Sequence, residues 1–161
     1  MTGQATTEHS DGKGMPALPA SARRLFASDR EATVVTIDPD GTPQASLVWM
    51  ALDRGSLVFG VEEHRRKVRN LRRDPRVTVI IHDNERTADG VADGLTQYLT
   101  VRGRATLLGP GIPDELTALM DTLARRYLGT DVYPFGNRGS ETGMIVRIAV
   151  ERIGGVGPWV D

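Results

Sequence analysis

The residues best suited to chemistry in this sequence form a stretch from Val61 to Leu71, which overlaps a basic run from Arg65 to Arg76. Between Arg65 and Arg76 the chain has 7 arginine or lysine residues and a single acid, Asp74. The stretch leaves a predicted strand and enters a predicted short helix, so free backbone N–H groups and the positive end of the helix dipole face outward there. Guanidinium and ammonium groups beside them can donate to phosphate oxygens. The pattern predicts a phosphate site at the start of this helix, with a solvated basic helix face as the alternative.

A second candidate lies in residues 41–49, where Gln44 and Ser46 fall on the same side of a predicted strand. Two polar groups on one face can hydrogen-bond the edge of a heterocycle. A strand with one solvent-facing side explains the same pattern, and the pattern alone favours that simpler interpretation.

Other kinds of active site are excluded or disfavoured by the residue content. The chain has no cysteine, which excludes disulfides, thiolate metal sites and cysteine nucleophiles. Its 3 histidines, His9, His64 and His82, have no metal-ligand spacing, and there is no P-loop or Gly-rich dinucleotide motif. An anion site without an evident nucleophile, metal site or acid–base pair indicates that a bound cofactor carries the chemistry.

The overall charge limits the partners that we expect. A net charge of −1 disfavours a general nucleic-acid surface, although the basic helix leaves DNA binding as an alternative of a different class. No apolar run approaches the roughly 20 residues that cross a bilayer, and residues 1–13 lack the hydrophobic stretch of a signal peptide. We expect a cytoplasmic protein that binds neither nucleic acid nor membrane and acts on a small molecule.

The elements that position these residues follow from hydrophobic periodicity and turn residues. Three helices are predicted, over 20–27, 64–74 and 112–128, the second with a narrow buried edge at Val68 and Leu71. The Gly-rich tail after residue 153 is predicted to be irregular, as are loops 84–94 and 130–140. Six strands are predicted, over 32–37, 44–52, 56–61, 76–82, 95–108 and 143–153.

These elements predict one domain over residues 20–161, preceded by a disordered tail over 1–19 that is too polar to bury much surface. The strands are mostly sequential and antiparallel. A sheet of this size best avoids exposed edges by closing into a barrel.

Several segments, in this order along the chain, resemble the actinobacterial F420-dependent split β-barrel oxidoreductases of the pyridoxamine 5'-phosphate oxidase-like superfamily. They are residues 32–37, residues 40–46, the run Lys67-x-x-Asn70-Leu71-x-x-Asp74-Pro75-Arg76, and the long strand around residues 98–105. The similarity spans roughly residues 23–153. It implies a mainly β fold with peripheral helices, a six-stranded antiparallel split β-barrel with Greek-key topology of the FMN-binding split-barrel type.

The resemblance also implies a homodimer with its cofactor at the interface, and hydride transfer from reduced F420 to a small electron-poor organic substrate. In it, Arg65 and Lys67 hold the cofactor phosphate with Arg66 nearby, and Asn70 braces the phosphate loop or the cofactor tail. The remaining implied cofactor contacts are Gln44, Ser46, Leu47 and Val48 around the ring, Val58 and Phe59 beneath it, and Gln97, Tyr98 or Trp159 from the partner subunit.

One departure limits the reaction that the resemblance implies. The chain ends in Arg152-Ile153-Gly154-Gly155 rather than in the Arg-Leu-type substrate motif of pyridoxamine phosphate oxidase itself, which argues against vitamin B6 oxidation. Two alternatives stay open: an FMN-binding oxidase or flavin reductase of the same fold, and a non-catalytic F420-binding protein. The substrate, the proton donor and the role of residues 130–140 are not predicted.

Overall fold

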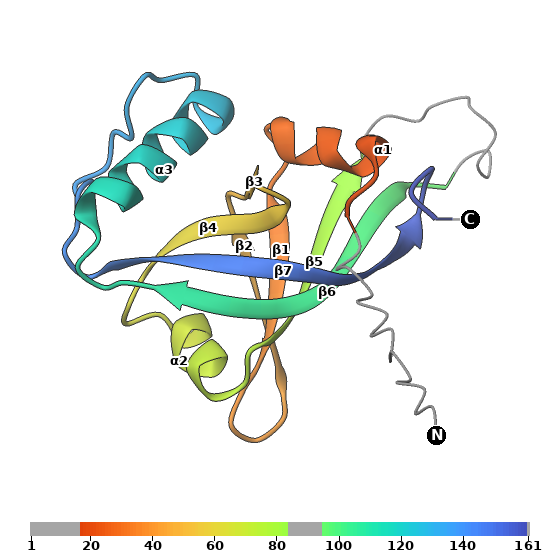
Figure 1. Ribbon diagram of the computed structural model, residues 1–161, viewed down its shortest axis with the longest axis horizontal. Helices are drawn as coiled ribbons and strands as arrows, with labels where there is room; N and C mark the ends of the chain where they lie inside the picture. Colours follow the sequence, from red (N-terminus) through yellow and green to blue (C-terminus); the bar gives the residue numbers. More distant parts are fainter. Residues whose placement is uncertain (1–16, 84–94, 161) are drawn as a thin grey trace, which may run out of the picture.

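Seven antiparallel strands form the sheet of this protein, which we describe from a computed structural model over residues 17–83 and 95–160. Figure 1 shows the strands wrapped around one core, with α3 and α2 on opposite sides of strands β4 and β7. In chain order the elements are α1 (Ala20–Arg23), a 3-10 turn η1 (Arg24–Ala27), β1 (Ala32–Ile37), β2 (Pro43–Val48), β3 (Ala51–Asp53), β4 (Ser56–Glu62), α2 (Arg66–Arg73), β5 (Arg76–Asp83), β6 (Gln97–Leu108), α3 (Pro113–Tyr127) and β7 (Gly143–Val156).

The sheet closes into a barrel because a short connection joins the strands at its two ends. The strand order is β2-β1-β5-β6-β7-β4-β3, and the chain passes from β2 to β3 through Trp49 and Met50 alone. A connection of this length spans only about 10 Å, so the sheet must curl until its ends approach. Strands β5, β6 and β7 pair in sequence and β7 returns beside β4, which is the predicted Greek-key connection.

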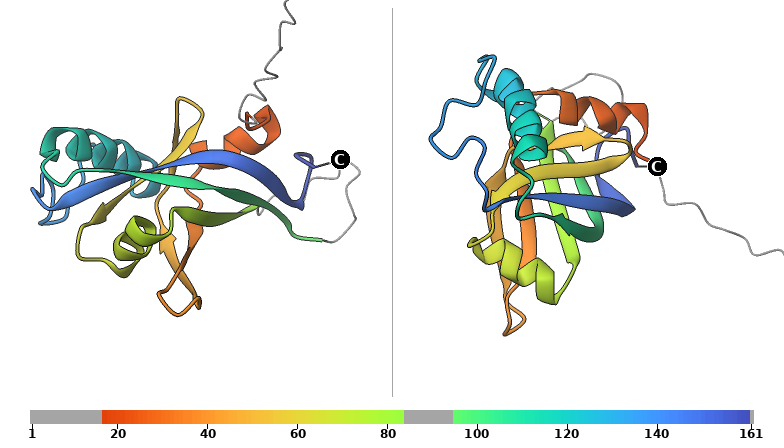
Figure 2. Two further views of the ribbon diagram at one scale, coloured as in Figure 1. Left: turned by 60° about the horizontal axis from the view of Figure 1, so that its bottom comes forward. Right: turned by 60° about the vertical axis from the view of Figure 1, so that its left-hand side comes forward.

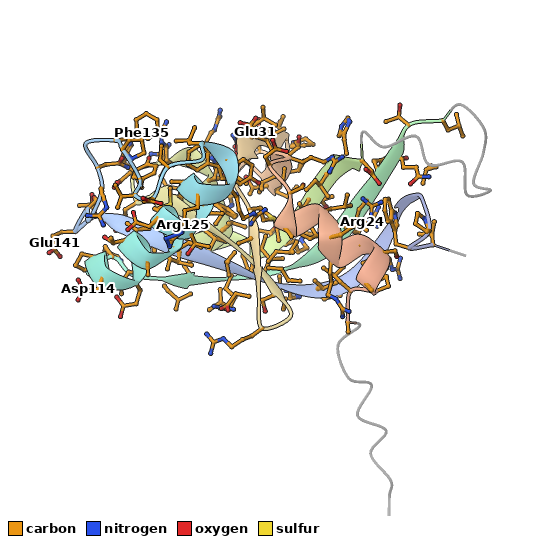
Figure 3. The ribbon with its side chains drawn as sticks, turned by 90° about the horizontal axis from the view of Figure 1, so that it is seen from above. Arg24, Glu31, Asp114, Arg125, Phe135 and Glu141 are labelled. Carbon is orange, nitrogen blue, oxygen red and sulfur yellow. The ribbon has the colours of Figure 1, made fainter. Side chains whose placement is uncertain are left out.

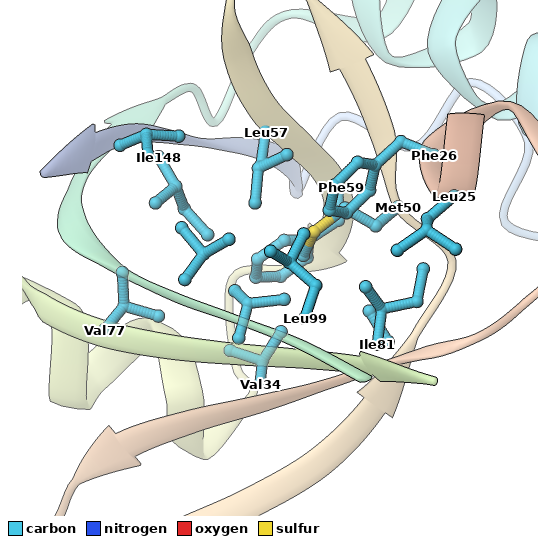
Figure 4. Packing of buried hydrophobic residues seen from close by; sticks show 14 of the residues in the cluster. Leu25, Phe26, Val34, Met50, Leu57, Phe59, Val77, Ile81, Leu99 and Ile148 are labelled. Atoms are coloured by element: carbon cyan, nitrogen blue, oxygen red, sulfur yellow. The ribbon is translucent and has the colours of Figure 1, made fainter. Parts of the chain in front are cut away.

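Alternate side chains of the strands fill the barrel interior. Buried and half-buried residues alternate along β1, so one of its faces packs on the core. Figure 4 shows Val34, Met50 and Phe59 converging on this interior. Leu18 is also buried, at 4% exposure, so the chain packs on the core before the predicted boundary at residue 20. Residues 1–16 of the predicted tail and the predicted loop 84–94 lie outside the described residues.

Two predicted strands differ from the observed ones. The predicted strand over 44–52 is two strands, because the chain leaves the sheet at Trp49 and Met50 to cross the barrel opening, so the sheet has seven strands rather than six. The prediction of an irregular tail after residue 153 is wrong as far as Val156, which still belongs to β7. A Cβ on Gly155 would lie 2.1 Å from the Tyr98 carbonyl oxygen, so glycine allows the close pairing of β7 with β6 here.

Strands β6 and β7 run along the whole molecule (Figure 1) and must bend to wrap the core. Their register shifts between Arg102 and Gly103, which is a β-bulge. A Cβ on Gly103 would lie 2.1 Å from the Ala149 backbone oxygen, so only glycine fits without moving the backbone. A bulge with such close approach increases local twist and bends the strand pair.

Helix α3 covers the outer face of the barrel at one end, and Figure 2 shows it projecting there with the loop that follows. Leu116 lies over Gly143 and Met120 lies over Gly60, where a Cβ would be 2.0 Å from the leucine methyl and 2.6 Å from the methionine sulfur. The two glycines therefore let the helix dock directly on β4 and β7. The predicted buried edge of α2, Val68 and Leu71, is confirmed. No helix among residues 17–83 and 95–160 is long and apolar enough to cross a bilayer.

Candidate functional site

A cavity of about 480 Å³ lies where the ends of β2 and β4 meet the start of α2 and one face of α3. This volume is in the range of small-molecule sites. Part of the cavity lining is basic, and another part is apolar and aromatic. The lining residues are Glu31, Ser46, Leu47, Val48, Trp49, Gly60, Val61, Glu62, Arg65, Lys67, Leu116, Met120, Leu123, Tyr133, Phe135 and Asn137.

Asn70 fixes α2 to the barrel and so positions the basic side of the cavity. It is 1% exposed, and its Nδ2 donates to Thr36 Oγ1 at 3.0 Å and to Asp38 Oδ1 at 2.9 Å. A buried amide with these partners holds the helix in one rotation relative to β1. Arg65, the residue before α2, and Lys67 in its first turn are thereby kept at the cavity wall.

The basic side has two cations without a counter-ion in the described residues. Neither Arg65 nor Lys67 forms a salt bridge within residues 17–83 and 95–160. Partial burial, and secondly the neighbouring charge of Arg65, lower the pKa of Lys67 below its ordinary value of 10.5. An anion in the cavity would relieve both effects. These residues therefore fit a phosphate group, as predicted for them.

The end of β2 supplies the predicted ring-side residues. Ser46, Leu47 and Val48 all line the cavity. The Ser46 hydroxyl oxygen is buried, and within the described residues it has no hydrogen-bond partner. A buried hydroxyl without a partner costs free energy unless a ligand or water satisfies it. Leu47 is 64% exposed, so it presents an apolar side chain at the cavity rim.

The other predicted residues on β2 and α2 support the site without lining it. Gln44 shares a face with Ser46 as predicted, but Gln44 accepts a hydrogen bond from Thr36 Oγ1 at 3.0 Å beside Asn70. Arg66 pairs with Asp38, Nε to Oδ1 at 3.0 Å, and does not line the cavity. Both residues belong to the network that fixes α2 to β1.

Four further predicted residues lie elsewhere in this protomer. Val58 faces α3 and Phe59 faces the barrel interior, because neighbouring strand residues point to opposite sides. Gln97 is buried at the start of β6, paired with Asp83. Trp159 is 5% exposed in the core, and its Nε1 donates to the Tyr98 carbonyl at 3.1 Å. Neither Val58 nor Phe59 lines the cavity, and their predicted place beneath the ring stays a prediction. The predicted contacts of Gln97 and Trp159 with a partner subunit's cofactor stay predictions as well.

The aromatic side of the cavity was not predicted. Trp49 stacks on Tyr127 with ring centroids 5.1 Å apart and an interplanar angle of 4°. Tyr133 meets Trp49 edge-on at 6.1 Å, and Phe135 meets Tyr133 at 5.1 Å. Figure 3 shows Phe135 and Glu31, both of which line the cavity, on the same side of the molecule. The aromatic residues Tyr133 and Phe135, two positions apart in loop 130–140, were the signal in the sequence from which this part of the cavity could have been predicted.

Glu62, at the end of β4, holds the loop that carries the aromatic residues. Its carboxylate accepts hydrogen bonds from Asn137 Nδ2 at 3.1 Å, Ser140 Oγ at 3.1 Å and Thr142 Oγ1 at 2.8 Å. Partial burial by itself raises the pKa of Glu62, but the hydrogen bonds, led by that of Thr142, outweigh it and hold the pKa below its ordinary value.

Asp121 on α3 is the second anchor of this loop. It accepts the Tyr133 backbone N–H at 2.8 Å and pairs with Arg138 at 2.8 Å. The Arg138 side chain, followed by the Tyr133 amide, lowers the pKa of Asp121 to about 2. Both anchors therefore stay ionised near neutral pH.

The described residues give no sign of a metal centre. Across residues 17–83 and 95–160, no three His, Asp or Glu side chains gather in a way that would hold a metal ion. The cavity thus has the donors for an organic anion rather than a ligand set for a cation.

Comparison with known proteins identifies relatives of the whole described chain. Residues 18–157 match the family described as pyridoxamine 5'-phosphate oxidase. A solved F420 reductase is 26% identical with a TM-score of 0.65, over 82% of this chain and 94% of that one. A conserved hypothetical protein of Mycobacterium tuberculosis is 24% identical with a TM-score of 0.67, over 94% and 89%. The heme storage protein HutZ of Vibrio cholerae is 16% identical with a TM-score of 0.61, over 88% and 96%; these last two likenesses show the fold alone.

Proposed function

Since residues 18–157 match that family, this chain belongs to the pyridoxamine 5'-phosphate oxidase family, and we propose that it is an F420-dependent reductase with the split-barrel fold of that family. The single observation that carries the proposal is the pair of cavity cations, Arg65 and Lys67, which have no described counter-ion. The similarity to a solved F420 reductase supports the choice of cofactor.

Different residues of this chain would bind different parts of the cofactor. Arg65 and Lys67 would hold the cofactor phosphate by charge-assisted hydrogen bonds. The Ser46 hydroxyl and the backbone of Leu47 and Val48 would be available to the ring. The chemistry that a bound deazaflavin supplies is hydride transfer to an electron-poor organic substrate.

Orientation and water exclusion are the remaining tasks of the protein. Trp49 and the apolar face of α3 supply the apolar part of the cavity lining. Holding a donor and an acceptor together in such a site supplies much of the rate advantage of an enzyme that lacks its own nucleophile. The overall fold and the aromatic residues of the cavity would thus both help to orient the hydride donor and the acceptor.

A homodimer belongs to the proposal, because one face of the barrel exposes apolar residues next to the cavity. Strand pairing sets Leu47, Thr33 and Ile80 in one row across β2, β1 and β5, with Val35 in the next row. Leu47 belongs both to this face and to the cavity rim. A second copy seated on the face would therefore cover the cavity and complete it.

Titration with two cofactors tests the proposal. We expect purified protein to bind F420 at micromolar concentration, measured by deazaflavin fluorescence, and to oxidise its reduced form in the presence of an electron-poor acceptor. Tighter binding of FMN, with a yellow protein from a host lacking F420, would favour the FMN-binding alternative. Tight F420 binding without turnover would favour a non-catalytic binding protein, and binding of neither cofactor would overturn the proposal.

Substitution of Lys67 links the binding to the basic side of the cavity. Lys67→Ala should weaken cofactor binding by about 1.5–3 kcal/mol, roughly tenfold to a hundredfold, because it removes a charged hydrogen-bond donor. Arg125→Ala is the matched control, since Arg125 is an exposed cation on α3 that does not line the cavity. Equal affinities of the two variants would place the phosphate elsewhere.

A further inference from the structure

A second cavity, of about 350 Å³, lies on the outer face of the sheet where strands β1, β5, β6 and β7 are neighbours. It shares no described lining residue with the cavity at the start of α2, which we call the cofactor cavity. Its volume is sufficient for a small molecule. The lining residues are Val35, Ile37, Arg76, Val77, Thr78, Arg102, Gly103, Arg104 and Glu151.

The register of the strands places like charges opposite one another at this cavity. Arg104 on β6 pairs with Arg76 on β5, and Arg102 on β6 pairs with Arg152 on β7. Residues directly opposite in an antiparallel pair have Cβ atoms about 5 Å apart, so like charges there repel and destabilise the pairing. Four arginines therefore lie together at a place where cross-strand pairing favours opposite charges.

Two acids hold the first of these arginine pairs. Asp74 accepts hydrogen bonds from Arg76, from Nε at 3.0 Å and from Nη2 at 2.7 Å. Glu151 lies 3.3 Å from Arg104 Nε. A guanidinium has five N–H donors, so both arginines keep donors for a further acceptor.

The second arginine pair has no acid of its own. Neither Arg102 nor Arg152 forms a salt bridge in the part of the chain that the structure describes. The β-bulge explains the difference, because Glu151 is the extra residue of β7 between the partners of Arg102 and Gly103. It is directed to Arg104 instead. An anion in the cavity would supply the missing counter-charge.

The donors and the rest of the lining indicate the chemistry of that anion. A phosphate monoester carries a charge of about −1.5 to −2 at pH 7 and three strong acceptor oxygens, whereas a carboxylate carries one charge and accepts one guanidinium fork. Several arginines around one cavity thus match a phosphate better. Val35 and Ile37 of β1 line the same cavity and offer apolar surface to an organic group.

We propose that this cavity is a second anion site, which binds phosphate monoesters with a small apolar organic group. Arg76, Arg102 and Arg104 donate to the phosphate. The site is independent of the proposed cofactor and of the reductase function. Val35 also belongs to the face proposed for a second copy, whereas Arg102 and Arg104 lie on β6, outside that face.

Amide chemical shifts of the purified, isotope-labelled protein without cofactor locate the ligand. Phenyl phosphate is titrated in, while the amides of Gly103 and Thr78 report on this cavity and that of Ser46 reports on the cofactor cavity. We expect saturating shifts at Gly103 and Thr78. Inorganic phosphate should bind there more weakly because it buries no apolar surface, and benzoate should bind at least about threefold more weakly because it accepts fewer charged donors.

Arg102→Gln should weaken phenyl phosphate binding at Gly103 about threefold to tenfold, the effect of one charged donor at a solvent-exposed site. Arg125→Gln, an exposed cation of α3 that lines neither cavity, is the matched control and should bind like wild type. Lys67→Ala should weaken any response at Ser46 and leave that at Gly103 unchanged.

Three results would overturn the second site. They are shifts confined to the cofactor cavity, equal affinities of Arg102→Gln and Arg125→Gln at Gly103, and benzoate binding as tight as that of phenyl phosphate. Failure of the protein to bind F420 or FMN overturns the proposed function alone, because the shifts at Gly103 are measured without either cofactor.

Discussion

Lys67 is a cation in surroundings that disfavour its charge. Its protonation and the binding of a phosphate should therefore depend on each other. Its burial and the neighbouring Arg65 lower its pKa, so it loses its proton at a lower pH than an ordinary lysine. A bound phosphate stabilises the charged form. Binding is therefore strongest where Lys67 is protonated, and it weakens as pH rises through the lowered pKa.

We accordingly expect cofactor affinity to fall between neutral pH and the ordinary lysine pKa of 10.5. The measurement is a series of F420 titrations at increasing pH. Lys67→Arg is the control, because arginine stays charged over this range and should give a nearly flat profile. The same loss of affinity in wild type and in Lys67→Arg would show that another group titrates.

The two-residue period of strand β2 predicts which of its residues share a face, but it does not predict what each of them contacts. The sequence places Gln44 and Ser46 on one face of β2, and that is confirmed by their pairing with Thr36 and Val34. Periodicity does not tell which residue of a face is hydrogen-bonded within the protein and which lines a cavity. Gln44 accepts a hydrogen bond from Thr36, whereas Ser46 lines the cavity.

At the scale of elements, every helix and most strands were predictable, and the aromatic part of the cavity lining was not. Each predicted helix is present, because turn residues and apolar spacing are local signals. Loop 130–140 is held by Glu62, which is 75 residues before Asn137 and 80 before Thr142. No local pattern encodes a contact at such separation.

Asp121 gives the most direct test of how this loop is held. Asp121→Ala removes the acceptor of the Tyr133 N–H and the partner of Arg138, so the loop should loosen while the barrel stays folded. We expect faster hydrogen exchange at the Tyr133 amide with little change in the melting temperature. Glu115→Gln, an exposed acid of the same helix, is the control.

Slow exchange at Tyr133 in Asp121→Ala would mean that Glu62 alone fixes the loop.

Because the pKa of Asp121 is about 2 and that of Glu62 is also lowered, both contacts are present at neutral pH and are lost only as pH falls through these lowered values. Moderate acid should therefore leave the loop in place in the wild-type protein.

For the whole molecule, the question is what covers the outer face of β1, β2 and β5. On this face Thr33, Val35 and Ile80 are half-buried and Leu47 is exposed, although strands β1 and β5 each have a neighbouring strand on both sides. Apolar residues gathered on a solvent-facing sheet usually mark an association surface. Because Leu47 also lines the cavity, association and cofactor binding should be coupled.

Val35→Glu tests that coupling, since it places a charge within the face but away from the lining of the cofactor cavity. We expect wild-type protein to sediment as a dimer and Val35→Glu to sediment as a monomer, because an interface core tolerates an unpaired charge poorly. The variant should also bind F420 more weakly, since the partner no longer covers the cavity. Thr122→Glu, on the exposed side of α3, should sediment and bind like wild type. A monomeric wild-type protein with full F420 affinity would show instead that one chain forms the complete site.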